Sequence, residues 1–108
     1  MHPFNYYDPS TVEEAVEILK KFGDRAKCLA GGTDVLVQTR GERYELDAIV
    51  DVKKIPELTS VEWTNDHLVI GAATPCYVLY EDPKVCEAFP GIIDSASLIG
   101  GIQIQSRA

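Results

Sequence analysis

The sequence predicts an α+β fold, in which a small parallel α/β lobe is followed by the start of an antiparallel α/β lobe. In the first half, helical and strand-like segments alternate, which is typical of parallel strands joined by helices. In the second half, two alternating segments flank an Asn-Asp pair that suits a tight hairpin, and helical segments follow. We therefore expect an N-terminal lobe over residues 1–55 and the beginning of a second lobe over residues 56–108.

The first expected helix covers residues 10–22. Ser10 and Glu13 fit the S-x-x-E capping box, apolar residues then recur at helical spacing, and Gly23 is a typical stop. The apolar spacing predicts that one face of this helix packs on a sheet.

Two buried strands are expected over residues 26–30 and 48–52, because both segments are short and apolar. Between them lies the sequence Gly-Gly-Thr-Asp at residues 31–34. Thr33 is expected to cap a short helix that runs to about Arg40. A strand, a helix and a strand in this order predict a parallel pair.

The second half is expected to open with a hairpin whose strands cover residues 60–64 and 67–71. Helices should follow from Pro75 and Pro83, because proline is favoured in the first helical turn. Residues 99–108 mix apolar and polar side chains. Gln103, Gln105 and Arg107 fit either a polar site or one face of an unfinished strand. The chain is therefore expected to be the first portion of a longer fold, since a lone hairpin rarely forms a stable sheet.

The adjacent glycines give the strongest local indication of a ligand. Glycines allow successive amide groups to converge on an anion such as a pyrophosphate. A tight strand-to-helix turn with positive φ explains the same residues without any ligand. The loop matches neither the Walker pattern nor GxGxxG, so its spacing leaves both interpretations open.

Composition limits the partner classes. The chain has 108 residues, of which 45% are hydrophobic, and a formal charge of −7. This charge disfavours binding to nucleic acid and to anionic membranes. No segment is typical of a signal peptide or long enough to span a membrane, which favours a cytoplasmic location. The 3 cysteines have no CxxC spacing, so a four-cysteine iron–sulfur site cannot form within the chain and a zinc site is disfavoured.

Two polar residues stand out individually. Asp51 lies within an apolar strand, so its carboxylate is expected to be structural, with Lys53 or a loop amide as its partner. Thr74 fits either a helix cap or a hydroxyl presented to a ligand. No arrangement typical of a catalytic triad is present in the sequence.

Several motifs in one order resemble the FAD-binding subunit of molybdenum hydroxylases of the xanthine dehydrogenase and carbon monoxide dehydrogenase type. They are PxFxYxxPxTxEEAxxxL, LAGGTDVL, IVDVxxIPEL, LVIGAAT and IGxxQIxxRA, and they cover residues 3–108. The resemblance implies a vanillyl-alcohol-oxidase-type FAD-binding fold, incomplete in this chain, with FAD between its two lobes.

The resemblance also implies which residues contact the FAD. The loop over residues 27–34 would hold the pyrophosphate through backbone amides, and Thr74 would lie near the flavin. A turn near residue 100 would approach the cofactor from the other side. The implied FAD-binding residues are Lys27, Cys28, Leu29, Ala30, Gly31, Gly32, Thr33, Asp34, Thr74, Gly100, Ile102 and Gln103, with no catalytic and no metal-binding residue.

The implied function is electron transfer within an oxidoreductase complex. FAD would receive electrons from a molybdenum centre through iron–sulfur clusters and pass them to an external acceptor such as NAD or a quinone. Molybdopterin would belong to a large partner subunit and the clusters to a small one. The chain alone is not expected to be an active enzyme.

The sequence departs from the family pattern in two places. A second phosphate loop of the Thr-Ile-Gly-Gly-Asn type would follow Ala108, and Gln105-Ser106 stands where the family commonly has Arg-Asn. One alternative is a cofactor-free remnant or assembly module that docks onto partner subunits. Another is a flavin enzyme of the broader superfamily with its own substrate domain.

Overall fold

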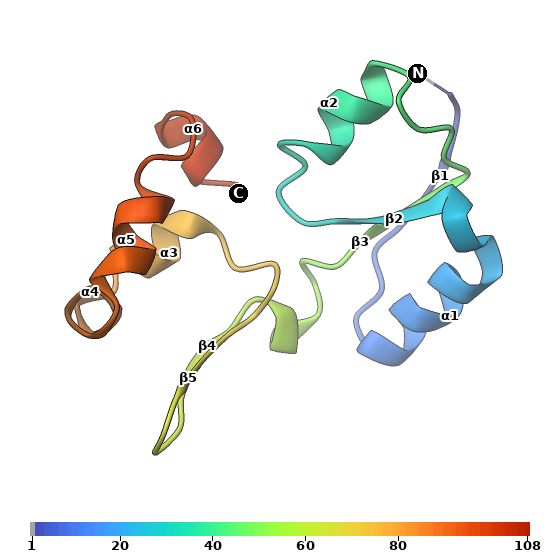
Figure 1. Ribbon diagram of the computed structural model, residues 1–108. Helices are drawn as coiled ribbons and strands as arrows, with labels where there is room; N and C mark the ends of the chain where they lie inside the picture. The colour runs from blue at the N-terminus through green and yellow to red at the C-terminus, as the bar shows by residue number, and fades with distance from the viewer. Residues whose placement is uncertain (1) are drawn as a thin grey trace.

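The computed structural model describes residues 2–108, which form a three-stranded sheet with two helices and a separate group of four short helices with a hairpin (Figure 1). The C-terminal residues lie between these two groups (Figure 1). In chain order the elements are β1 (Asn5–Tyr7), α1 (Val12–Phe22), β2 (Ala26–Leu29), α2 (Val35–Arg40), β3 (Ala48–Asp51), β4 (Val61–Trp63), β5 (Leu68–Ile70), α3 (Cys76–Tyr80), α4 (Pro83–Ala88), α5 (Pro90–Ala96) and α6 (Ile102–Gln105).

The three-stranded sheet has the order β1-β3-β2, and both strand pairs are parallel. The predicted parallel pairing of the two apolar strands is confirmed. β3 lies in the middle and every one of its residues is buried, as expected for a parallel strand covered on both faces. β1 was not predicted, because its three residues, Asn-Tyr-Tyr, carry no apolar alternation.

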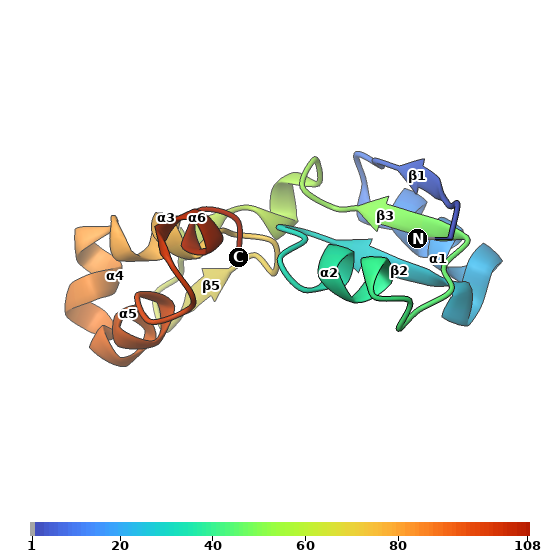
Figure 2. The same cartoon turned by 90° about the horizontal axis from the view of Figure 1, so that it is seen from above.

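Helices α1 and α2 cover opposite faces of this sheet (Figure 2). Successive side chains of a strand point to opposite faces, and β3 follows this rule. Val50 belongs to the core cluster under α1 together with Ala15. Ile49 belongs to the cluster on the other side, where Val35 and Leu36 of α2 pack. The sheet therefore has a small core on each face.

The N-terminal cap of α1 differs from the prediction by one residue. The hydroxyl of Thr11, not Ser10, accepts a hydrogen bond from the Glu14 amide (3.2 Å), and the Ser10 amide donates to the Glu14 carboxylate (3.3 Å). Both registers satisfy the S/T-x-x-E pattern, so the sequence could not separate them. Gly23 ends the helix with a φ of 55°, as predicted.

Replacing Thr11 by Ala should lower the free energy of unfolding by about 1 kcal/mol, because the amide of Glu14 loses its acceptor. Ser10→Ala should change it by less than about 0.5 kcal/mol, since the Ser10 hydroxyl caps nothing among the described residues. Urea unfolding of the two variants measures this difference. Equal losses, or a larger loss for Ser10→Ala, would contradict the observed register.

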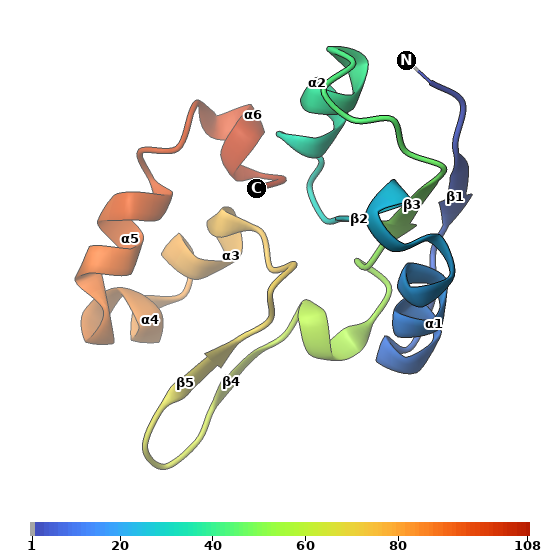
Figure 3. The same cartoon turned by 45° about the vertical axis from the view of Figure 1, so that its right-hand side comes forward.

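The hairpin of β4 and β5 is antiparallel and confirms the prediction. The turn is closed by a hydrogen bond from the Thr64 amide to the His67 carbonyl (2.9 Å). The hairpin extends away from the sheet (Figures 1 and 3). It is tied to the helical group next to its turn, where the ring of Trp63, the last residue of β4, stacks on Phe89 with centroids 6.1 Å apart.

The C-terminal segment contains the short helix α6, so the unfinished-strand alternative for residues 99–108 was wrong. Within α6 the side chain of Gln105 is buried, and its amide donates to the Ser97 carbonyl (2.9 Å). The chain then turns back, and the Cys76 amide donates to the Ala108 carbonyl (2.5 Å). None of the helices in residues 2–108 has the length and apolar character needed to cross a membrane.

Candidate functional site

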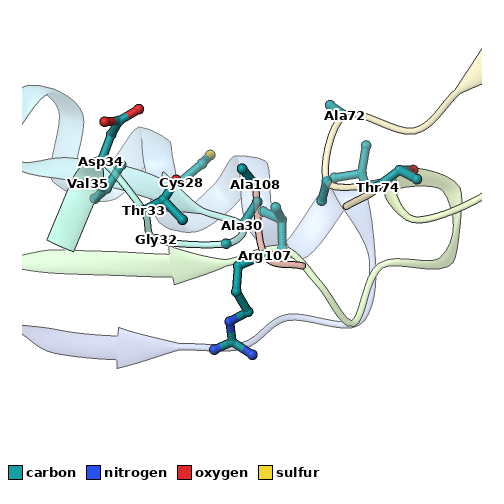
Figure 4. A pocket seen from close by; sticks show the side chains of 14 residues that line it. Cys28, Ala30, Gly32, Thr33, Asp34, Val35, Ala72, Thr74, Arg107 and Ala108 are labelled. Atoms are coloured by element: carbon teal, nitrogen blue, oxygen red, sulfur yellow. The ribbon is translucent and has the colours of Figure 1, made fainter. Parts of the chain in front are cut away.

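A pocket of about 410 Å³ lies where the sheet and the helical group meet (Figure 4). Three segments form most of it: the loop after β2, the residues before α3, and the chain after α6. The residues that line it are Cys28, Ala30, Gly31, Gly32, Thr33, Asp34, Val35, Val52, Leu58, Ala72, Ala73, Thr74, Arg107 and Ala108. A pocket of this size can hold a small molecule or part of a larger one.

The two glycines of the loop are required by neighbouring parts of the chain itself. A Cβ on Gly31 would lie 2.0 Å from the carbonyl oxygen of Arg107. Gly32 has a φ of +78°, and a Cβ there would lie 2.9 Å from the Leu36 side chain. The sequence suggested that the backbone approaches something closely here, and the structure shows that Gly31 approaches residues 107–108. Gly32 has the positive φ that the tight turn requires.

The amides of this loop have no acceptors among the described residues. The amide nitrogens of residues 31–34 donate no hydrogen bond to another group of residues 2–108. The expected cap by Thr33 was wrong, because α2 begins at Val35 with Asp34 as its cap residue, and no side chain caps it. Residues 31–34 all line the pocket, and successive amides without internal acceptors are suited to an anion.

Thr74 supplies a second unpartnered polar group in the same pocket. Its Oγ1 is buried and has no hydrogen-bond partner among the described residues. The capping alternative was wrong, because Pro75 is the cap residue of α3 and no side chain caps that helix. A buried hydroxyl without a partner costs about 1–3 kcal/mol, which a bound acceptor or donor would recover.

Some of the expected FAD-binding residues line the pocket and others do not. Seven of them line the pocket, namely Cys28, Ala30, Gly31, Gly32, Thr33, Asp34 and Thr74. The Lys27 ammonium lies over the Tyr44 ring, 4.3 Å from its centroid, and Leu29 belongs to the core under α2. Gly100, Ile102 and Gln103 do not line the pocket.

The site also contains residues that were not expected. Ala72 and Ala73 precede Thr74, and Ala108 follows Arg107, for which a polar site was one of the two predicted alternatives. All four lie within motifs that the sequence already distinguished, LVIGAAT and IGxxQIxxRA. The apolar residues Val52 and Leu58 also lie within a quoted motif, IVDVxxIPEL, but their contact with a pocket was not expected, because a pocket floor and a core position look alike in sequence.

Asp51 is partnered as predicted. Its carboxylate accepts from the Lys53 ammonium (2.8 Å), the Lys53 amide (3.0 Å) and the Tyr6 hydroxyl. Burial raises the pKa of Asp51, but these three hydrogen bonds outweigh it and hold the pKa below its usual value. The same carboxylate raises the pKa of Tyr6 to about 12.

The Asp51 network should make stability dependent on acid pH. A carboxyl group with a depressed pKa contributes stability above its unfolded pKa, near 4, and loses it as pH falls through the folded value. Asp51→Asn should therefore lower the unfolding free energy by about 2 kcal/mol at neutral pH. The difference in unfolding free energy between the wild type and Asp51→Asn should become smaller below about pH 4. Urea titrations across this range test it, and a difference that stays constant or widens in acid would contradict it.

Comparison with known proteins identifies the family. Residues 2–108 match the family described as the FAD binding domain in molybdopterin dehydrogenase. The chain is 34% identical over 104 residues to the carbon monoxide dehydrogenase medium chain of Hydrogenophaga pseudoflava. It is 35% identical over 105 residues to the xanthine dehydrogenase FAD-binding subunit of Escherichia coli O157:H7. Each match covers 96% of this chain and 36% of the relative, so the chain spans about a third of their length.

Solved structures confirm the predicted fold class. One chain of a carbon monoxide dehydrogenase from Hydrogenophaga pseudoflava superimposes with a TM-score of 0.93 at 33% identity, covering 100% of this chain and 38% of that one. The quinoline 2-oxidoreductase of Pseudomonas putida 86 shares the fold with a TM-score of 0.91 at 21% identity, again covering 100% and 38%. The resemblance stated from the motifs is confirmed, and the chain belongs to the family of FAD binding domains in molybdopterin dehydrogenases.

Proposed function

We propose that this chain binds FAD in the pocket described above. The backbone amides of residues 31–34 would hold the pyrophosphate, and the Thr74 hydroxyl would contact the cofactor. The single observation that supports this most is that the unpartnered amides and the orphaned Thr74 Oγ1 belong to the same pocket. The pyrophosphate of FAD supplies acceptors for the amides, and the rest of the cofactor carries polar groups that can pair with the Thr74 hydroxyl.

The charge of the chain supports binding through the backbone. With a formal charge of −7, the protein field repels an anion, so local donors must hold it. Arg107 is the one cationic residue among those that line the pocket, and its side chain extends away from Asp34 and Thr74 (Figure 4). Backbone N–H groups are therefore better placed than a basic side chain to bind the phosphates.

The family supports a proposed role for the chain in a larger assembly. When bound, FAD supplies one- and two-electron chemistry between iron–sulfur clusters and an external acceptor. The residues of this chain would bind and orient the cofactor. We infer that the parent assembly is a molybdenum hydroxylase with a large molybdopterin-binding partner and a small iron–sulfur partner. The expected contacts of Gly100, Ile102 and Gln103 with FAD remain predictions.

The second candidate function is a cofactor-free module that docks onto partner subunits. It is favoured by apolar side chains that remain exposed around α5 and α6, of which Leu98 is 80% and Ile102 is 79% exposed. Exposed apolar residues close together on a surface are typical of interaction sites. This function and FAD binding make different predictions for the pocket around residues 31–34.

The experiment is incubation of the purified chain with FAD, desalting, and an absorbance spectrum of the retained flavin. Alkylation of Cys28 provides an independent readout, because Cys28 is exposed and lines the pocket, whereas Cys86 does not line it. We expect retained flavin absorbance and slower alkylation of Cys28 with FAD present, with Cys86 unaffected. A folded chain that retains no flavin and shows no protection of Cys28 would favour the docking module.

A further inference from the structure

One side chain, that of Lys53, connects the Asp51 carboxylate to the glycine loop. The Lys53 ammonium donates to the Asp51 carboxylate (2.8 Å) and also to the Ala30 carbonyl (2.9 Å). Ala30 directly precedes Gly31. Lys53 therefore connects the end of β3 to the first residue of the loop that carries the unpartnered amides.

The position of Lys53 is itself fixed by the carboxylate. Besides the ammonium, the backbone amide of Lys53 donates to Asp51 (3.0 Å), and the Tyr6 hydroxyl of β1 contacts the same carboxylate. The Asp51 side chain is only 9% exposed, whereas that of Lys53 is 40% exposed. A buried acceptor with three donors gives the lysine a defined geometry.

The bond to Ala30 determines the direction of a loop amide. The Ala30 carbonyl and the Gly31 amide belong to one peptide unit, which is planar. In a trans peptide the C=O and N–H bonds point in opposite directions, and the described residues contain no cis peptide bond. Anchoring the Ala30 oxygen on Lys53 therefore directs the Gly31 N–H away from Lys53.

We propose that Lys53 is a positioning residue for the phosphate-binding loop: its ammonium, held by Asp51, fixes the Ala30–Gly31 peptide and so pre-orients the amides of residues 31–34. This inference rests on the proposed function of that loop. Lys53 is not among the residues that line the pocket, so it acts through the peptide and not by contact with the ligand. Groups that hold binding groups in place in this way raise affinity by lowering the ordering cost of binding.

Lys54 provides a matched control. It neighbours Lys53 and carries the same charge, but its ammonium pairs with Asp8 (2.5 Å) and makes no hydrogen bond to the loop. Replacing either lysine by Met removes one positive charge and keeps an unbranched side chain. Any general electrostatic effect on an anionic ligand should therefore appear in both variants, whereas loss of the peptide anchor should appear only in Lys53→Met.

The test measures FAD affinity and loop motion in the wild type, Lys53→Met, Lys54→Met and Lys53→Arg. We expect Lys53→Met to weaken FAD binding about tenfold, a size typical of one charge-assisted hydrogen bond. Lys54→Met should stay within about twofold of the wild type. Lys53→Arg, which keeps a charged donor, should recover most of the loss. Without FAD, the NMR order parameters of Gly31 and Gly32 should fall in Lys53→Met only.

The outcomes separate this inference from the proposed function. Unchanged affinity and unchanged order parameters in Lys53→Met, or equal changes in both Met variants, would overturn the role of Lys53. If the wild type fails to bind FAD, the proposed function fails, and the order parameters of the free protein still decide whether Lys53 holds the loop. Circular dichroism of each variant establishes that it is folded before either comparison.

Discussion

Gly31→Ala should abolish the pocket as it is built, with an expected loss of about 3 kcal/mol in stability and about hundredfold in FAD affinity. The added Cβ would lie 2.0 Å from the Arg107 oxygen and 2.4 Å from its carbonyl carbon. Both are backbone atoms, which cannot move aside as the end of a flexible side chain can. Residues 107–108 would have to leave the loop, and the bond from Cys76 to Ala108 would break with them.

Gly91→Ala is the matched control for this prediction. A Cβ on Gly91 meets nothing within 4 Å, and the residue lies in the first turn of α5. Alanine there should leave stability unchanged or raise it by up to about 1 kcal/mol, because alanine is the better helix former. Urea unfolding and FAD titration of the two variants provide the comparison. If Gly31→Ala matches the wild type in both its free energy of unfolding and its FAD affinity, residues 107–108 do not pack on this loop.

Thr74→Val should change stability and FAD affinity in opposite directions. Valine has the shape of threonine but no hydroxyl, so the substitution removes the buried oxygen that has no partner among the described residues. The free protein should gain about 1 kcal/mol in stability, while FAD should bind about tenfold more weakly. A residue with a purely structural role would not give this pair of effects.

Thr39→Val is the control for Thr74→Val. Thr39 is also buried, at 1% exposure, but its hydroxyl donates to the Val35 carbonyl (2.7 Å) and does not line the pocket. Its replacement should leave FAD affinity unchanged and should not stabilise the protein. Thermal unfolding with and without FAD measures both quantities. Equal behaviour of the two valine variants would contradict a ligand-binding role for the Thr74 hydroxyl.

Local patterns predicted much of the fold. The α1 helix, the parallel pairing of β2 with β3, and the hairpin were predictable because periodicity, glycine and turn residues act over a few positions. Asp51 was also predictable, since a carboxylate in an apolar strand requires partners. The cap of α1 was misplaced by one residue because Ser10 and Thr11 both satisfy the pattern.

The remaining features depend on contacts between distant residues. β1 is a strand because Tyr6 pairs with Ile49, which its own sequence does not reveal. An unfinished strand was one of two interpretations of the α6 region, whose four helical residues, Ile-Gln-Ile-Gln, alternate like a strand. The reason for Gly31 lies at Arg107, so the sequence could indicate a close approach without identifying what approaches.

The most direct test of the central claim is an NMR titration of the labelled chain with FAD, ADP and riboflavin. ADP shares with FAD a pair of linked phosphates, which riboflavin lacks. If the loop binds the pyrophosphate, the amide signals of residues 31–34 should shift with FAD and with ADP, and should not shift with riboflavin alone. If FAD leaves these four amides unchanged, or shifts only residues around α5 and α6, the loop does not bind the cofactor and the proposed function is wrong.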